Sequence, residues 1–216
     1  MEDGILNKSM VEGQIKPIGG MNEQLLSVFY SLDRNDFMPE KLKKMAYVEK
    51  NITLKNNRTI LRPDLIAKII LCVDLKADEN VLVLGASTGY LSAILSYLAE
   101  TVIVVEEDEQ LLNSAESSIK KNDINNVVFI KKEIIKGYHD QSPFNAIIIE
   151  GAIQFVPANI LDQLDEGGRL LAIVHEKGTC SARLFKKNKN IITNQNLFNC
   201  SIPVLDSFKK KNIFSF

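Results

Sequence analysis

Residues 80–106 begin with Asn80-Val-Leu-Val-Leu-Gly85-Ala-Ser-Thr-Gly89-Tyr90 and end with Val104-Val105-Glu106. A short apolar run leads into a glycine turn, a helical segment follows, and a second apolar run ends at an acid. Such a turn lets the backbone approach a nucleotide-like ligand, and an acid about 20 residues later accepts hydrogen bonds from ribose hydroxyls. The stretch therefore predicts an α/β protein with a ligand site between Gly85 and Glu106.

The alternation of apolar runs and amphipathic helices continues on both sides of this stretch. The predicted strands are Val81–Leu84, Val102–Val105, Val127–Ile130, Ala146–Ile149 and Leu170–Val174. The predicted helices are one from Glu23 to about Leu32 capped by Asn22, one beginning at Pro63, and Tyr90–Ala99, Asp108–Lys121 and Pro157–Leu164. Because the strands are continuously apolar, they are expected to be buried on both faces, as in a parallel sheet covered by helices on both faces.

The pattern changes after residue 181. Arg183–Lys187 and Ile191–Phe198 flank a turn and predict an antiparallel hairpin. A mostly parallel, seven-stranded sheet that ends in such a hairpin is typical of Rossmann-like class I methyltransferases. We expect residues 1–60 to form an N-terminal cap segment on the substrate side, and residues 61–216 to form the methyltransferase domain.

The composition excludes several classes of function. Apolar residues make up 45% of the chain and the net charge is −1, so no global basic field attracts nucleic acid or an anionic membrane. No apolar run has the length of a membrane span, and the first 25 residues contain no apolar block of a secretory signal. The three cysteines are scattered, which predicts a reducing, cytoplasmic environment and no metal site.

The glycine turn narrows the class of ligand. A dinucleotide fingerprint requires G-x-G-x-x-G, but Ser87 and Tyr90 replace its second and third glycines. The methyltransferase form, acid-x-G-x-G-x-G, fits better because Gly85 and Gly89 match its outer glycines, although Val83 replaces its acid. A plain strand-to-helix turn, with glycines for positive φ, is the alternative. The ribose acid is Glu106 or its neighbour Glu107.

Motifs along nearly the whole chain resemble one family. The matching segments are Met10-Val11-x-x-Gln14, Asp33–Pro39, Ala46–Glu49, Thr59–Pro63, Leu84–Tyr90, Pro143–Asn145, Val156-Pro157 and Gln163–Leu170. In this order and at this spacing, they resemble the protein-L-isoaspartate O-methyltransferases. The resemblance implies transfer of a methyl group from S-adenosylmethionine to the α-carboxylate of isoaspartyl residues in proteins or peptides, a repair reaction.

The resemblance also assigns residues to the site. Those at the family's cofactor positions are Gly85, Ala86, Ser87, Gly89, Tyr90, Glu106, Glu107 and Glu133. Thr59, Ile60 and Leu61 occupy the substrate-side motif, where Leu61 replaces the serine whose hydroxyl faces the reacting carboxylate. The neighbouring Arg62 offers a charge that compensates for this loss.

The departures from the family pattern lie at its functional positions. They are Leu61, Val83, Ser87 and the segment Lys132-Glu133-Ile134, which stands where the family has G-D-G. Such a chain resembles the diverged alphaproteobacterial branch that lacks the serine. Neither His139 nor His175 has a catalytic partner at a recognisable spacing, and the [DN]-P-P-[YF] motif of amino-group methyltransferases is absent.

Three functions therefore remain open at this point: an isoaspartyl carboxyl methyltransferase, a binding or interaction protein on a methyltransferase scaffold, and a methyltransferase with another acceptor. The second predicts that reverting Leu61 to serine and Ser87 to glycine restores affinity or activity. The sequence makes no prediction of oligomeric state.

Overall fold

The computed structural model describes residues 2–210. Its centre is a seven-stranded sheet in the order β5-β4-β3-β6-β7-β8-β9. The strands are β3 (Asn80–Leu84), β4 (Thr101–Glu106), β5 (Val127–Lys131), β6 (Phe144–Ile153), β7 (Leu164–Glu176), β8 (Thr179–Asn188) and β9 (Ile191–Asn199). Strands β3 to β7 run parallel to one another, β8 pairs antiparallel with β7, and β9 pairs antiparallel with β8. The predicted sheet with its terminal hairpin is confirmed.

Alternate side chains of β3 separate the two faces of the sheet. Val81 and Val83 belong to one apolar core, and Leu82 and Leu84 belong to the other. All four side chains are fully buried, because helices or loops cover both faces. The continuously apolar runs of the sequence therefore mark strands of the sheet centre.

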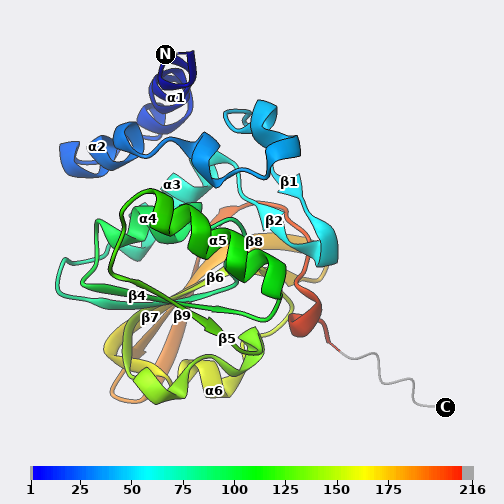
Figure 1. Cartoon of the computed structure of the whole chain (residues 1–216). Coiled ribbons are helices and arrows are strands. Elements are labelled where there is room, and N and C mark those ends of the chain that lie inside the picture. The colour runs from blue at the N-terminus through cyan, green and yellow to red at the C-terminus, as the bar shows by residue number, and fades with distance from the viewer. Residues whose placement is uncertain (1, 211–216) are drawn as a thin grey trace.

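Figure 1 shows that most helices lie on one side of the sheet. This layer contains α3 (Pro63–Val73), α4 (Tyr90–Ser96) and α5 (Glu109–Lys121), with α1 (Glu2–Met10) and α2 (Glu23–Ser31) beyond it. The short α6 (Ala158–Leu161) covers the opposite face. The Asn22 side chain accepts a hydrogen bond from the Leu25 amide, as expected of the cap of α2.

The N-terminal segment packs into the larger core. Met10, Phe29 and Phe37 are buried in the same cluster as Val83 of the sheet. A two-stranded antiparallel sheet of β1 (Ile52–Thr53) and β2 (Thr59–Ile60) then leads into α3. Residues 2–60 thus pack against the central sheet without a separate large core.

Several boundaries differ from the sequence-based expectation. Helix α4 ends at Ser96 instead of Ala99, and α6 is a single turn, because Leu164 already begins β7. Strand β6 continues beyond Ile149 to Ile153, past a register shift against β7. Strand β5 lies at a sheet edge and is only partly buried. Within residues 2–210, no helix combines the length and apolar character needed to cross a membrane.

Candidate functional site

The glycine turn lies where the strand order of the sheet reverses. Strand β3 has β4 on one side and β6 on the other, and both are parallel to it. In open α/β sheets, ligands bind at the carboxyl ends of the strands at this point. The turn also closely approaches β6, because a Cβ atom placed on Gly85 would lie 3.4 Å from the carbonyl oxygen of Glu150.

Three small residues of the turn, Gly85, Ser87 and Gly89, have backbone conformations with positive φ, and each makes a close contact that explains its small side chain. Gly85 and Gly89 have φ values of +95° and +86°, a region that L side chains rarely adopt. Gly89 is the N-cap residue of α4, and a Cβ atom there would lie 3.2 Å from the Cβ of Ala115 in α5. Ser87 also has a positive φ of 44°, and its hydroxyl donates to the Thr59 carbonyl at 3.0 Å. Ser87 therefore ties the turn to the substrate-side motif.

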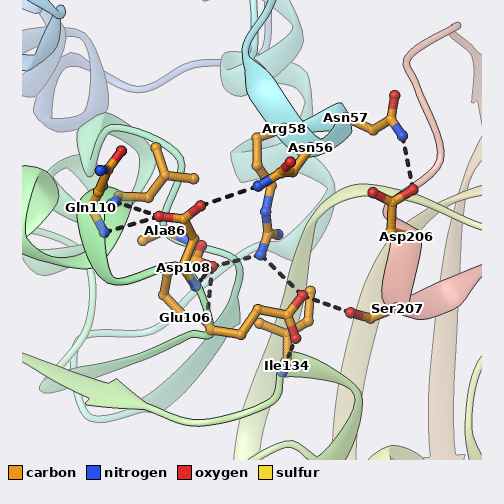
Figure 2. A network of polar contacts seen from close by, with 12 residues as sticks. Asn56, Asn57, Arg58, Ala86, Glu106, Asp108, Gln110, Ile134, Asp206 and Ser207 are labelled. Carbon is orange, nitrogen blue, oxygen red and sulfur yellow. Dashed lines mark hydrogen bonds and ion pairs between the residues drawn. The ribbon is translucent and has the colours of Figure 1, made fainter.

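Glu106 ends β4 with a carboxylate that is fully buried. One oxygen, Oε2, accepts from the Ala86 amide at 2.8 Å, and Oε1 accepts from the amides of Glu107 and Asp108, each at 2.8 Å. Oε1 also accepts from Nη2 of Arg58 at 2.5 Å. Backbone amides thus fix the orientation of this acid. Figure 2 shows that Arg58 reaches it from the loop that precedes β2.

The two acids after Glu106 line a small cavity. Glu107 Oε1 accepts from the Ser207 hydroxyl at 2.6 Å, and Asp108 caps α5 by accepting from the amides of Gln110 and Leu111. The cavity has a volume of about 230 Å³ and is lined by Asn56, Arg58, Glu107, Asp108 and Asp206. This wall combines residues from three distant parts of the chain.

The substrate-side motif is largely apolar where the family has a hydroxyl. Thr59 and Ile60 form β2, and the Leu61 side chain is fully buried in the main core. The Leu61 carbonyl accepts from Nη2 of the buried Arg34 at 2.5 Å. The Arg62 guanidinium, expected to compensate for the lost serine, pairs with Asp64 at 3.0 Å.

Several buried polar atoms near the turn lack a hydrogen-bond partner among residues 2–210. They are Arg34 Nη1, Arg58 Nη1, Thr59 Oγ1, Tyr90 OH and Glu150 Oε2. The Arg34 guanidinium lies 4.9 Å from the centre of the Tyr90 ring. Burial, with the nearby charge of Glu106 adding to it, raises the pKa of Glu150 well above the ordinary value. Unpaired buried polar groups at the end of a central strand are a feature of ligand sites.

The other residues that the sequence assigns to the cofactor site do not have side chains that line the cavity. The Ala86 and Tyr90 side chains are buried in the core, so Ala86 contributes its amide. Glu133 has a side chain that is 59% exposed, and it pairs with Lys136 at 2.7 Å. It does not line the cavity beside Glu107. The structure therefore brings Glu106 and Glu107 together at the turn and leaves Glu133 at the surface.

Sequence reasoning missed Arg58, Arg34 and Asp206 as site residues. Arg58 precedes the substrate-side motif directly, so its position next to Thr59 was the available signal. Arg34 belongs to a matched family segment, but nothing in its local sequence marks it as buried. Asp206 reaches the site by hydrogen bonding to Asn57 at 2.9 Å, a contact over 149 residues that no local pattern reveals.

The sheet order, the turn at the switch point and the acid at the end of the next strand are those of the Rossmann-like methyltransferase fold. Two solved structures have the same fold: a protein-L-isoaspartate O-methyltransferase with a TM-score of 0.81, and one from Plasmodium falciparum in complex with S-adenosyl-L-homocysteine, with a TM-score of 0.79. They are 22% and 20% identical to this chain and cover 92% and 95% of it, while the chain covers 65% and 98% of them.

Sequence comparison identifies the family. The family profile described as "Protein-L-isoaspartate(D-aspartate) O-methyltransferase (PCMT)" matches residues 6–208. Relatives named protein-L-isoaspartate O-methyltransferase include those of Methanoculleus marisnigri, 27% identical over 93% of this chain and 92% of the relative, and Aliivibrio salmonicida, 33% identical over 78% and 79%. The chain belongs to the protein-L-isoaspartate O-methyltransferase family.

Proposed function

We propose that this protein transfers the methyl group of S-adenosylmethionine to the carboxylate of L-isoaspartyl residues in proteins or peptides. The family match over residues 6–208 carries the proposal, and it favours an enzyme over a binding protein on the same scaffold. When bound, S-adenosylmethionine supplies a sulfonium-bound methyl group, which a carboxylate oxygen attacks in line with departure of the neutral thioether.

The residues at the turn fit such a cofactor. Gly85 adds no side chain of its own at the end of β3, so a ligand can approach its backbone closely. In our proposal, the Glu106 carboxylate accepts the ribose hydroxyls at the end of β4, with Glu107 beside it at the cavity. Three backbone amides hold Glu106 in place, so its orientation does not depend on the ligand.

The acceptor side of the site has to position its ligand and exclude water, and it does not have to supply reactive groups. The isoaspartyl carboxylate is already a nucleophile, so no general base is required, and placement and exclusion of water provide the acceleration. A buried Leu61 is compatible with this chemistry because it excludes water, although it donates no hydrogen bond. We assign residues 1–60 to the wall of the acceptor site, where Arg34 braces the carbonyl groups of Ala46 and Leu61.

The location of the reaction is part of the proposal. The three cysteines, Cys72, Cys180 and Cys200, are unpaired and half-buried. Free thiols persist in a reducing compartment, which supports a cytoplasmic protein that acts on aged cytoplasmic proteins.

Transfer of a tritium-labelled methyl group to an isoaspartyl peptide tests the function. The matched control is the same peptide with ordinary aspartate, and release of labelled methanol by mild base identifies the product as a carboxyl ester. We expect base-labile label only with the isoaspartyl peptide. No transfer from a folded protein that binds S-adenosylhomocysteine would reject the isoaspartyl acceptor and favour another one. Absence of binding as well would favour a non-catalytic scaffold.

A further inference from the structure

The loop before the substrate-side motif lies across the proposed cofactor site. Asn56 donates to Asp108 at 3.4 Å and Asn57 donates to Asp206 at 2.9 Å, while Arg58 reaches Glu106 and Glu107. Figure 2 shows these contacts side by side, with the arginine in the middle. The loop is therefore attached to both walls of the cavity.

Arg58 uses the face of Glu106 that a ribose would need. Glu106 Oε1 already accepts from Arg58 Nη2 and from two backbone amides, and Oε2 accepts from the Ala86 amide. The arginine side chain is 4% exposed and that of Glu106 is fully buried, so water does not separate them. A ribose hydroxyl reaches this carboxylate only after the guanidinium has moved.

The remaining space is too small for a nucleoside ligand. Pockets for ligands of this size measure roughly 300–1,000 Å³, whereas the cavity beside Arg58 measures about 230 Å³. Arg58 Nη1 also lies 3.2 Å from the position of a Cβ on Gly85, so the guanidinium stands directly in front of the turn. The same atom has no hydrogen-bond partner within residues 2–210.

The loop has few restraints against opening. Lys55 and Asn56 are exposed, and the two asparagine contacts are exposed polar hydrogen bonds, which stabilise a loop only weakly. Asn56 and Asn57 both have positive φ, at 55° and 56°, which forms the tight turn that brings Arg58 inward. A single buried ion pair is thus the main attachment of the loop.

We propose that Arg58 competes with the cofactor for Glu106. The ion pair between Arg58 and Glu106 must break, and the loop must move, before the cofactor binds, and this lowers cofactor affinity. The inference rests on the proposed function, because it takes Glu106 as the ribose acid. Arg58 is a determinant of affinity here, separate from any group that contacts the transferred methyl.

Calorimetric titration of S-adenosylhomocysteine tests this proposal without any turnover. We expect Arg58→Ala to bind at least tenfold more tightly than the unchanged protein, because Glu106 keeps its three amide donors and loses only its competitor. The control Lys55→Gln removes an exposed positive charge from the same loop and should leave affinity unchanged.

A second variant keeps the test decisive if Arg58→Ala does not fold. Asn57→Gly retains the positive φ and removes only the contact to Asp206, so it should increase affinity two- to fivefold. Equal or weaker binding by both variants, with normal binding by the unchanged protein, would overturn the role of Arg58 and leave the proposed function standing. Loss of binding in all proteins, the unchanged one included, would reject the cofactor site and this inference with it.

Discussion

The two halves of the site differ in what their buried side chains offer. On the half assigned to the cofactor, Glu106 is a buried charge that accepts hydrogen bonds from three backbone amides and an arginine. On the half assigned to the acceptor, Leu61 is a buried apolar side chain and Arg62 is paired with Asp64. Under the proposed function, the half that binds ribose hydroxyls must keep its polar groups, whereas the half that positions the acceptor carboxylate depends on its shape.

The largest effect is expected on the charged half. Glu106→Gln should weaken binding of S-adenosylhomocysteine at least 100-fold and lower the free energy of unfolding by about 3–5 kcal/mol, because Arg58 would remain buried without its counter-charge. Calorimetry and urea unfolding measure the two effects. Glu133→Gln is the matched control, since its side chain is 59% exposed and should change neither quantity. An equal loss of binding in Glu133→Gln would instead assign Glu133 to the cofactor site.

The apolar half should respond through stability. Leu61→Ser leaves a cavity and buries a hydroxyl, so the free energy of unfolding should fall by about 2–5 kcal/mol. Leu6→Ser, at a side chain that is 45% exposed, should change it by less than about 0.5 kcal/mol. Both are measured by denaturant unfolding. If Leu61→Ser kept full stability and gained methyl transfer, the acceptor half would depend on a hydroxyl after all.

A smaller, pH-dependent effect is expected at Glu150, which lies between the halves. Burial raises the pKa of this carboxyl well above the ordinary 4.5 in the folded protein. The folded state then binds more protons than the unfolded state above about pH 4.5, so the free energy of unfolding should fall as the pH rises towards the higher pKa.

Glu150→Gln should remove this decline, which has a slope of at most about 1.4 kcal/mol per pH unit. Urea unfolding of the variant and the unchanged protein at a series of pH values measures the difference, which should grow with pH. The exposed Glu100→Gln should show a parallel curve to the unchanged protein. Parallel curves for Glu150→Gln as well would mean that Glu150 is solvated.

The smallest effect is expected where the halves touch. Ser87→Gly relieves a left-handed side-chain conformation, a gain of about 1–2 kcal/mol. It loses a hydrogen bond to Thr59 and adds chain entropy in the unfolded state, together of similar size. Denaturant unfolding should therefore show a change within about 1 kcal/mol. A larger loss would identify the Ser87–Thr59 contact as a main link between the turn and the acceptor strand.

The sheet could be predicted from sequence because its signals are local. Apolar runs such as Val81–Leu84 and the cap Asn22 are each visible within a few residues. The end of α4 was predicted too late because Tyr97 and Leu98 look helical, although the chain turns there before β4. The length of β6 was missed because its last residues pair with β7 after a register shift.

The site could be predicted only where a residue sits at the end of a predicted strand. Glu106 and the glycine turn satisfy that condition. Arg58 does not, since its partner lies 48 residues away and a guanidinium on a polar loop is usually solvated. For Glu133, the family pattern placed a carboxyl near the site, but the exposed ion pair with Lys136 turns the side chain outward.

Residues 205–207, near the end of the described chain, complete the cavity wall, so they determine when during synthesis the pocket can form. Gly151 leaves room for Leu205, whose amide donates to the Ala152 carbonyl. This contact places Asp206 on the cavity wall and Ser207 against Glu107. The cavity wall therefore combines Asn56 and Arg58 with Glu107, Asp108 and Asp206. During synthesis, Asp206 is added more than 50 residues after the last residue of the central strand β6, Ile153. The pocket wall is thus completed late in biogenesis, after all the strands of the sheet centre have been synthesised.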